Sequence, residues 1–342
     1  MKTCFASGLR LVFKFFLLIT AITASAQSRI TLVGSGSNLP SPVFAIWIDQ
    51  FNKLDPGIQV RYLALGTEES LRQISAGTGD FGAGEVPLTE QLSRTYKNAL
   101  VAIPSVPVGV VPIYNLPGQP ELRFTGELMA EIFLGSVKNW NDARIARLNP
   151  HEKLPDLPIA VIHRTPGKGS NFILTDFLSK TSSEFRARVG KSASPKWPLG
   201  AAVNRGEDMV DKVQATSGAF GYVEEYFAVH AGVGRGAVQN ASGEFVLASV
   251  SSISAACDNL KSIPKNFAAS LANVSAAHAY PITSFSWIYL PVSNPNPERR
   301  QALAKFLDWV LGTGQDVARD HGYAILPAEV AGKARESVAQ LQ

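Results

Sequence analysis

Short apolar runs alternate along this chain with longer segments in which apolar residues recur every three or four positions. The clearest helical example is the segment 43–51, whose apolar side chains fall on one helix face: Val43, Phe44, Trp47, Ile48 and Phe51. Further helices are expected at 68–76, 124–134, 142–148, 171–178, 206–215 and 297–311. Strands are expected at 29–33, 58–65, 80–85, 159–163 and 218–223. This alternation is typical of an α/β fold.

Two extended apolar runs indicate how the chain is divided. Ile103–Pro112 and Tyr280–Leu290 both suit a chain that crosses between two lobes. A chain of 342 residues with 46% hydrophobic residues is long enough to bury two medium-sized cores. The pattern therefore predicts one lobe built from residues 28–106 and 285–342, and a second lobe built from residues 107–284.

The first 26 residues have the pattern of a cleavable signal peptide. A basic start is followed by the short apolar stretch Phe15–Ala24 and by Ala24-Ser25-Ala26, which is typical of a cleavage site before Gln27. The apolar stretch is too short for a permanent membrane anchor. No cysteine stands at the cleavage site, so we expect a periplasmic protein without a lipid anchor.

Removal of this segment changes the charge and the cysteine content. The discarded residues carry three of the basic side chains and no acidic one, so the formal net charge falls from +4 to about +1. A charge this small does not favour nucleic acid as a partner. Cys257 is then the only cysteine, which excludes a disulfide within the chain.

Small polar turns follow several of the predicted strands. Gly34–Leu39 and Gly66-Thr67 follow the first two strands, and Gly167–Asn171 follows a strand that ends in Arg164. Ligands of open α/β sheets bind at the carboxyl ends of strands, and a helix start offers free N–H donors to an oxyanion. Ser170 is the expected N-cap of the helix after the third turn, and the Arg164 guanidinium can contact two oxygens of an anion. The third turn therefore predicts half of an anion-binding site. The alternative is an ordinary strand–turn–helix unit with a surface arginine.

The chain contains no recognisable set of catalytic or metal-binding residues. Its five histidines form no H-E-x-x-H pattern, and no G-x-S-x-G motif is present. The G-x-G-x-x-G match at Gly77–Gly82 follows a helix and precedes a strand, which is the reverse of the dinucleotide-binding arrangement. The sequence therefore predicts a binding protein, not an enzyme, with no metal and no cofactor.

Seven ordered segments resemble the periplasmic phosphate-binding proteins of high-affinity phosphate ABC transporters. GSGSNLPSP at 34–42 is similar to the family's G-A-G-A-T-F-P-A-P, and DFGAGE at 80–85 to its D-F-G-A-S-D. RTPGKGS at 164–170 stands where the family has R-x-D-G-S-G-T. The remaining matches are Phe133–Asp142, Lys196–Gly200, Gly218–Glu224 and Tyr280–Ser284. The resemblance implies a two-lobed type II periplasmic binding protein with a mixed sheet in each lobe and the ligand in the interlobe cleft.

The resemblance also implies which residues contact the ligand. Backbone N–H groups of Asn38 and Leu39 and the hydroxyl of Thr67 would donate to the anion. Arg164 would pair with its oxygens, and Gly169 and Ser170 would donate from their helix start. Glu85 stands where the family has an aspartate that accepts a proton from phosphate, and such a carboxylate rejects sulfate because sulfate has no proton to offer.

Four of these positions depart from the family pattern, namely Asn38, Leu39, Glu85 and Lys168. Glu68 and Glu69 also replace small residues, and Lys168 either adds a cation to the site or pairs with Glu68 or Glu85. Inorganic phosphate is the expected ligand, with a phosphonate or a phosphate ester as alternatives. A secreted phosphatase and a non-transport sensor are the alternative functions. The expected partners are the permease subunits of an ABC transporter, and the expected state is a monomer.

Overall fold

The computed structural model describes residues 29–260, 262–292 and 295–340. The predicted signal peptide at 1–26 lies outside these residues. Among the described helices, none combines the length and the apolar character needed to cross a membrane. The helices are α1 (Ser41–Leu54), α2 (Thr67–Ser75), α3 (Glu90–Ser93), α4 (Gly126–Leu134), α5 (Ala143–Leu148), α6 (Gly169–Thr181), α7 (Ser183–Arg188), α8 (Gly206–Gln214), α9 (Glu225–Ala231), α10 (Val250–Asp258), α11 (Pro297–Leu311), α12 (Thr313–Asp320) and α13 (Ala328–Ala339).

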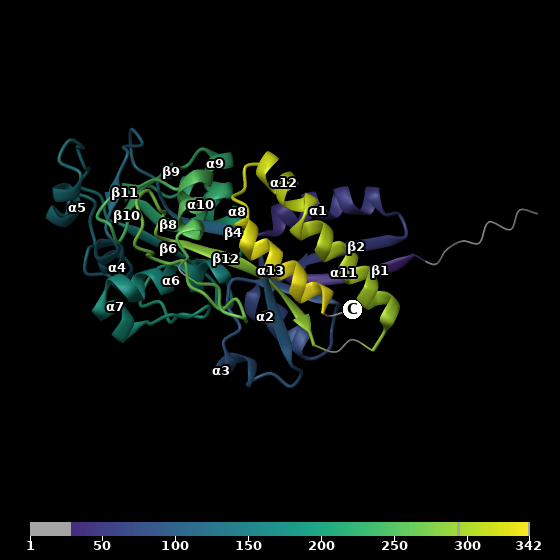
Figure 1. The fold of residues 1–342 in the computed structure, drawn as a ribbon. Helices are drawn as coiled ribbons and strands as arrows, with labels where there is room; N and C mark the ends of the chain where they lie inside the picture. The colour runs from purple at the N-terminus through teal and green to yellow at the C-terminus, as the bar shows by residue number, and fades with distance from the viewer. Residues whose placement is uncertain (1–28, 261, 293–294, 341–342) are drawn as a thin grey trace, which may run out of the picture.

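One long mixed sheet runs through the molecule in the strand order β2-β1-β3-β12-β4-β8-β6-β7, and β9 pairs with β4 (Figure 1). Its strands are β1 (Ile30–Gly36), β2 (Ile58–Ala64), β3 (Phe81–Gly84), β4 (Leu100–Tyr114), β6 (Ala160–Arg164), β7 (Ala201–Val203), β8 (Ala219–Glu224), β9 (Gly234–Arg235) and β12 (Thr283–Pro291). A small second sheet contains β5 (Arg123–Phe124), β10 (Ala237–Gln239) and β11 (Phe245–Val246).

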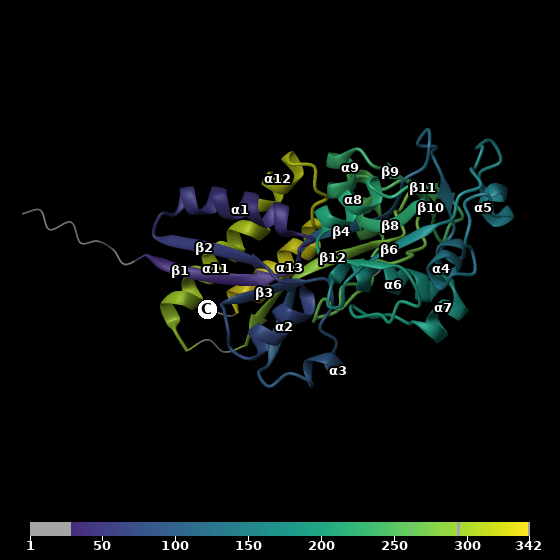
Figure 2. The same ribbon diagram turned by 180° about the vertical axis from the view of Figure 1, so that it is seen from behind.

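The strand β4 joins two halves of this sheet. In the first half, β2, β1 and β3 are parallel and β12 runs antiparallel to β3 and β4. In the second half, β4 is antiparallel to β8, while β8, β6 and β7 are parallel. Figures 1 and 2 show α1 and α11 at one end of the molecule and α4, α5 and α7 at the other, with β4 and β12 between them. Each half is therefore a mixed sheet covered by helices, which confirms the predicted fold class.

A β-bulge interrupts the pairing of the two crossing strands. Ser286 pairs with Val106, but Trp287 pairs with Pro104, so Ser105 is an extra residue on β4. The Ser105 hydroxyl donates a hydrogen bond of 3.0 Å to the carbonyl of Ser286, and both side chains are buried. Bulges of this kind redirect neighbouring side chains and are common beside binding sites.

Each half has its own aromatic core. In the first half, the ring of Phe44 on α1 stacks on Tyr62 and packs against Trp47, and Phe81 of β3 contacts Phe306 of α11. Gly34 lies beneath this cluster, where an added Cβ would come within 2.1 Å of the Phe81 ring, so only glycine fits. In the second half, the packed rings are those of Tyr114, Phe124, Phe133, Trp140 and Phe220.

Most predicted elements are present, but two predicted helix starts are wrong. The helix α2 begins at Thr67 itself after Gly66, whose φ of +113° suits glycine. The helix α6 begins at Gly169, so Ser170 lies inside its first turn and is not the N-cap. Neither helix start has a side-chain cap. Phe124 was also expected in a helix but lies in β5, because α4 begins after the cap residue Thr125.

We predict that the ion pair between Arg299 and Asp80 makes a large contribution to stability. Asp80 is buried, and Arg299 donates to it twice, at 2.9 and 2.6 Å, while the Val33 N–H donates at 2.7 Å. Arg299→Ala leaves a buried carboxylate without its cation and is expected to lower the free energy of unfolding by about 3–5 kcal/mol.

Urea unfolding followed by tryptophan fluorescence measures this loss. Arg319→Ala is the matched control, since it removes an exposed pair with Asp316 on one helix and should cost less than about 1 kcal/mol. Equal losses in the two variants would contradict the prediction.

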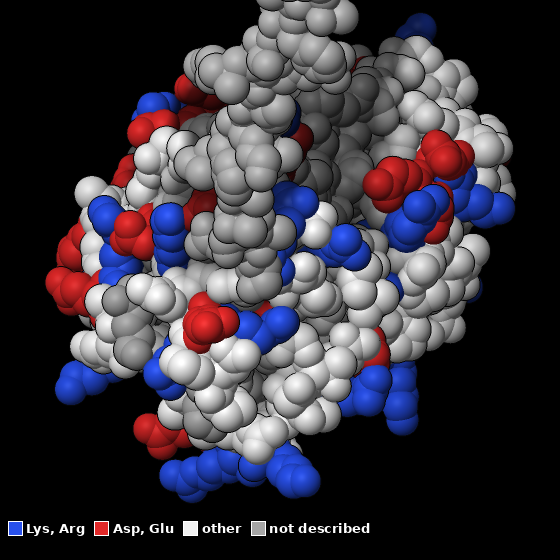
Figure 3. All heavy atoms as spheres, turned by 90° about the vertical axis from the view of Figure 1, so that its right-hand side faces the viewer, with Lys and Arg blue, Asp and Glu red and all other residues white. Residues whose placement is uncertain are grey.

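The charged side chains are mixed over the outer end of the first half. Basic and acidic residues lie next to one another on this face (Figure 3). The ion pairs of the described chain include Lys305 with Asp55 and Arg335 with Asp308. A surface of this kind has no large field of one sign to attract a polyanion.

Candidate anion-binding site

Four loops of the sheet bring the predicted ligand residues together. Asn38 and Leu39 follow β1, Thr67 follows β2, Glu85 follows β3, and the turn 165–168 follows Arg164 at the end of β6. The carboxyl ends of the parallel strands β1, β2 and β3 meet at one edge of the first half of the sheet. The contacts of Gly169 with Glu85 and of Gly167 with Glu68 bring the end of β6 and the start of α6 to the same place. We refer to Asn38, Leu39, Thr67, Glu85, Arg164, Lys168, Gly169 and Ser170 as the candidate anion site.

The carboxyl group of Glu85 is the most enclosed acidic group of this site. It is fully buried and accepts hydrogen bonds from Thr67 Oγ1 at 3.0 Å and from Ser286 Oγ at 3.1 Å. Burial raises the pKa of Glu85 to about 7, and hydrogen bonds from Ser37, Thr67 and Ser286 oppose this rise. At neutral pH the group is therefore close to the point at which it can either accept or donate a proton.

Glu85 also contacts the start of α6 from the other half of the sheet. A Cβ added to Gly169 would lie 1.5 Å from Glu85 Oε2 and 2.9 Å from Thr67 Oγ1. A glycine is therefore required at position 169, because any side chain would push the carboxyl group away. The first turn of a helix favours an anion, and here that turn faces a carboxyl group.

Arg164 is buried at the end of β6. Its Nη2 donates to the carbonyl oxygen of Asn204 at 2.7 Å, whereas its buried Nε has no hydrogen-bond partner among the described residues. No carboxylate of the described chain lies within ion-pair distance of this guanidinium. Burial lowers the pKa of Arg164, and Glu85 and other nearby groups oppose this effect. A buried cation without a counter-ion is costly, so the side chain is suited to an anionic ligand.

Lys168 precedes α6 and is also buried. Its Nζ lies 3.5 Å from the carbonyl oxygen of Leu65, on the loop between β2 and α2. Burial lowers its pKa, and the nearby Arg164 lowers it further. No ion pair joins Lys168 to Glu68 or Glu85 within the described residues, so the structure does not support that pairing.

The loop after β1 uses part of its polar groups in hydrogen bonds within the loop. The Leu39 N–H, a predicted donor to the anion, donates to Ser37 Oγ at 3.2 Å. Asn38 is buried, and its Oδ1 has no hydrogen-bond partner among the described residues. Ser170 is buried in the first turn of α6. Among the described residues, two polar atoms of the site thus have no hydrogen-bond partner: Asn38 Oδ1 and Arg164 Nε, in residues from opposite halves of the sheet.

Several residues that support the site were not predicted from the sequence. Ser37 and Ser286 hold Glu85, and Tyr222 holds the turn after Arg164. The Arg164 N–H donates to the Tyr222 hydroxyl at 3.0 Å, and that hydroxyl donates in turn to Asn171 Oδ1. The only sequence signal for Tyr222 was its place in the matching segment Gly218–Glu224.

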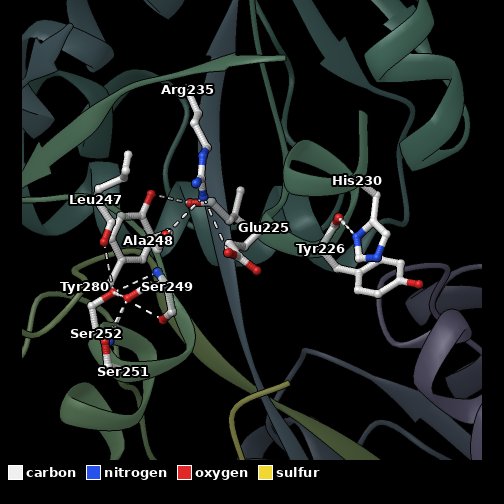
Figure 4. Close-up of polar contacts among 11 residues, drawn as sticks. Glu225, Tyr226, His230, Arg235, Leu247, Ala248, Ser249, Ser251, Ser252 and Tyr280 are labelled. Atoms are coloured by element: carbon white, nitrogen blue, oxygen red, sulfur yellow. Dashed lines mark hydrogen bonds and ion pairs between the residues drawn. The ribbon is translucent and has the colours of Figure 1, made fainter. Parts of the chain in front are cut away.

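A second buried carboxyl group, that of Glu224, lies at the junction of β8 and α9. Burial raises its pKa well above the usual range, and Glu85 raises it further. The next residue, Glu225, lies 3.5 Å from Arg235, which also donates to the Ala248 carbonyl at 3.1 Å (Figure 4). These contacts join α9 to the segment before α10 and fix the end of β8 beside the site.

Within the described part of the chain, no three His, Cys, Asp or Glu side chains lie close enough together to hold a metal ion. The site is instead a pair of buried cations, a buried carboxyl group and three loops with helix starts. This arrangement on a mixed two-part sheet defines a solute-binding protein of the type II periplasmic binding fold.

Comparisons with known proteins agree with this class. The sequence model of the PBP superfamily domain matches residues 21–313. The phosphate-binding protein PstS of Haemophilus influenzae is 35% identical over 320 residues, which cover 93% of this chain and 95% of that protein. The Pasteurella multocida PstS is 35% identical over 313 residues, with coverages of 91% and 89%. The chain therefore belongs to the PstS family of phosphate-binding proteins.

Solved structures show the same fold. A periplasmic phosphate-binding protein (PfluDING) with bound phosphate gives a TM-score of 0.70 at 15% identity and covers 90% of this chain and 94% of its own. The phosphate-binding protein of Stenotrophomonas maltophilia gives a TM-score of 0.68 at 20% identity, with the same coverages. The family consists of solute-binding proteins, which confirms the prediction of a binding protein in place of an enzyme.

Proposed function

We propose that this protein binds inorganic phosphate in the candidate anion site and delivers it to the permease subunits of an ABC transporter. The observation that carries the proposal is the buried Arg164, whose Nε has no hydrogen-bond partner within the described part of the chain, opposite the buried carboxyl group of Glu85. A ligand that is both an anion and a hydrogen-bond donor complements this pair, and hydrogen phosphate has both properties. The PstS relatives are named for the same ligand.

The proposal includes the cellular context and the division of the chain. We place the mature protein in the periplasm after cleavage of residues 1–26, without a lipid anchor, and as a monomer. We assign residues 28–106 and 285–342 to one lobe and 107–284 to the other. The crossing of β4 and β12 between the two halves of the sheet supports this division. Several charge-assisted hydrogen bonds of about 1.5–3 kcal/mol each suffice for micromolar or tighter binding.

A larger phosphorus compound is a less suitable ligand. Contact between Glu85 and Gly169 closes the site from both halves, and the loop at 65–68 touches the turn at 167–168. A phosphonate or a phosphate ester carries a substituent that would have to separate these contacts. The structure thus favours a small tetrahedral anion.

Calorimetric titration of the mature protein tests the proposal. The protein is first unfolded, freed of ligand and refolded in phosphate-free buffer, and is then titrated at pH 8 with phosphate, sulfate, methylphosphonate and glycerol phosphate. Phosphate is expected to bind with a Kd of about 1 μM or lower. Sulfate is expected to bind at least about 10⁴-fold more weakly because it cannot donate a proton to Glu85. If either organic compound binds more tightly than phosphate, that compound and not phosphate is the ligand.

A further inference from the structure

The loop that carries Thr67 and the turn that precedes α6 are joined by a ring of hydrogen bonds. The Glu68 N–H donates to the Gly167 carbonyl oxygen at 3.2 Å. The Gly167 N–H donates to Ser194 Oγ at 2.8 Å and to the Ala193 carbonyl oxygen at 3.0 Å, and the Ser194 hydroxyl donates to Glu68 Oε2 at 2.6 Å. Glu68, in the first half of the sheet, thus contacts the backbone of Gly167 in the second half in two ways. Its N–H donates to the Gly167 carbonyl oxygen, and its carboxylate reaches the Gly167 N–H through Ser194.

This ring lies directly beside the candidate anion site. Gly167 has a φ of +82°, a conformation that suits glycine, and the next three residues are Lys168, Gly169 and Ser170. Glu68 follows Thr67, whose hydroxyl donates to Glu85. A shift of the turn would therefore move the donors of α6 relative to the donors of α2, and errors of about 1 Å in such positions are costly.

We infer that Glu68 is a positioning residue of the anion site: through Ser194 and Gly167 it holds the start of α6 against the loop after β2, and it slows release of the bound anion. The inference rests on the proposed function. It assigns a role to an acidic residue that would otherwise be expected only to repel a nearby anion. The carboxylate is exposed, so solvent screens its charge, whereas its hydrogen bond to Ser194 is short.

The neighbouring residue Glu69 provides a matched control. Its carboxylate accepts from Arg72 Nε at 2.8 Å and from Gln73 on the same helix. Glu69→Ala removes the same charge one residue further along without touching the ring. Glu68→Gln keeps an oxygen acceptor for Ser194 but removes the charge, and Ser194→Ala breaks the ring from its other side.

Stopped-flow measurement of phosphate release tests the inference. Glu68→Ala and Ser194→Ala are each expected to raise the release rate and the Kd by about 3- to 10-fold, and the double variant should add little to either. Glu68→Gln should retain most of the wild-type rate, and Glu69→Ala should match the wild type. Tighter binding by Glu68→Ala would show that repulsion dominates and would overturn the inference, as would an unchanged release rate.

Hydrogen exchange separates this inference from the proposed function. In the ligand-free protein, Ser194→Ala is expected to speed exchange at the Glu68 amide, which donates to Gly167 across the two halves of the sheet, and Glu69→Ala is not. If the wild-type protein fails to bind phosphate, the proposed function fails, but this measurement still tests the ring. Unchanged exchange at the Glu68 amide in Ser194→Ala would refute the positioning role whatever the ligand is.

Discussion

Arg164→Ala is expected to weaken phosphate binding by about 10²- to 10⁴-fold while the protein remains folded. The guanidinium supplies one of the two buried positive charges of the candidate anion site, and charge-assisted hydrogen bonds contribute about 1.5–3 kcal/mol each. The backbone of residue 164 is held independently by the Tyr222 hydroxyl and by pairing of β6 with β7 and β8. Calorimetry with phosphate measures the loss, and circular dichroism checks the fold.

Arg164→Lys separates charge from geometry. Lysine keeps the positive charge but lacks the planar fork that contacts two oxygens and also reaches the Asn204 carbonyl. We expect this variant to bind more tightly than Arg164→Ala and more weakly than the wild type. Wild-type affinity in Arg164→Ala would remove Arg164 from the site and leave Lys168 as the principal cation.

Glu85→Gln is expected to abolish the discrimination between phosphate and sulfate. In the proposed mode of binding, the wild-type carboxylate accepts a proton from phosphate and repels sulfate, whereas the amide of the variant would donate to either anion. Sulfate affinity should rise and phosphate affinity should fall, so a ratio of about 10⁴ should shrink to about 10 or less. Competition of each anion against labelled phosphate at pH 8 gives the ratio directly.

The same residue makes the discrimination depend on pH. Burial raises the pKa of Glu85 to about 7, so the group is largely protonated at pH 5.5 and can then donate a hydrogen bond to sulfate. Discrimination by the wild type should therefore weaken as the pH falls from 8 to 5.5, while that of Glu85→Gln should stay constant. Glu85→Asp restores the carboxylate typical of the family and should retain selectivity. A wild-type ratio that is independent of pH would contradict this account.

The raised pKa of Glu85 should also make the stability of the ligand-free protein depend on pH. A carboxyl group whose pKa is raised in the folded state favours folding when it is protonated. Its contribution to the free energy of unfolding is therefore fully present below its usual pKa near 4.5 and is lost as the pH rises through about 7. The difference between these pKa values corresponds to about 3 kcal/mol. The ligand-free wild type should therefore lose stability between pH 4.5 and 7 relative to Glu85→Gln.

The secondary structure was largely predictable because its signals are local. Apolar spacing located α1, and Pro297 and the apolar face placed α11 at the residues where it occurs. The short strands β7, β9, β10 and β11 gave no such signal, since each has only two or three residues. Residues such as Thr67 and Ser170 commonly cap helices, so the sequence favours them as caps, but both helices begin after residues that provide no side-chain cap.

The candidate site was predictable only in part. Glycine-rich turns after strands and the basic side chain of Arg164 indicated an anion, and the matching segments supplied the set of ligand residues. Ser286 could not be found in this way, because a hydroxyl in an apolar strand gives no sign that it reaches Glu85, which lies 201 positions earlier. The ring through Glu68 and Ser194 joins residues 126 positions apart and likewise required the three-dimensional structure.

The bulge at Ser105 has a consequence for how this protein can be recombined with its relatives. Ser105 lies opposite no residue of β12, so its deletion would keep the pairs Val106–Ser286 and Pro104–Trp287 but would remove the local distortion of β4 and the hydrogen bond to the Ser286 carbonyl. Ser286, whose hydroxyl donates to Glu85, would then lose the hydrogen bond that its own backbone accepts from Ser105. The two halves of the molecule are consequently not interchangeable modules, and a functional chimera must take β4 and β12 from the same parent.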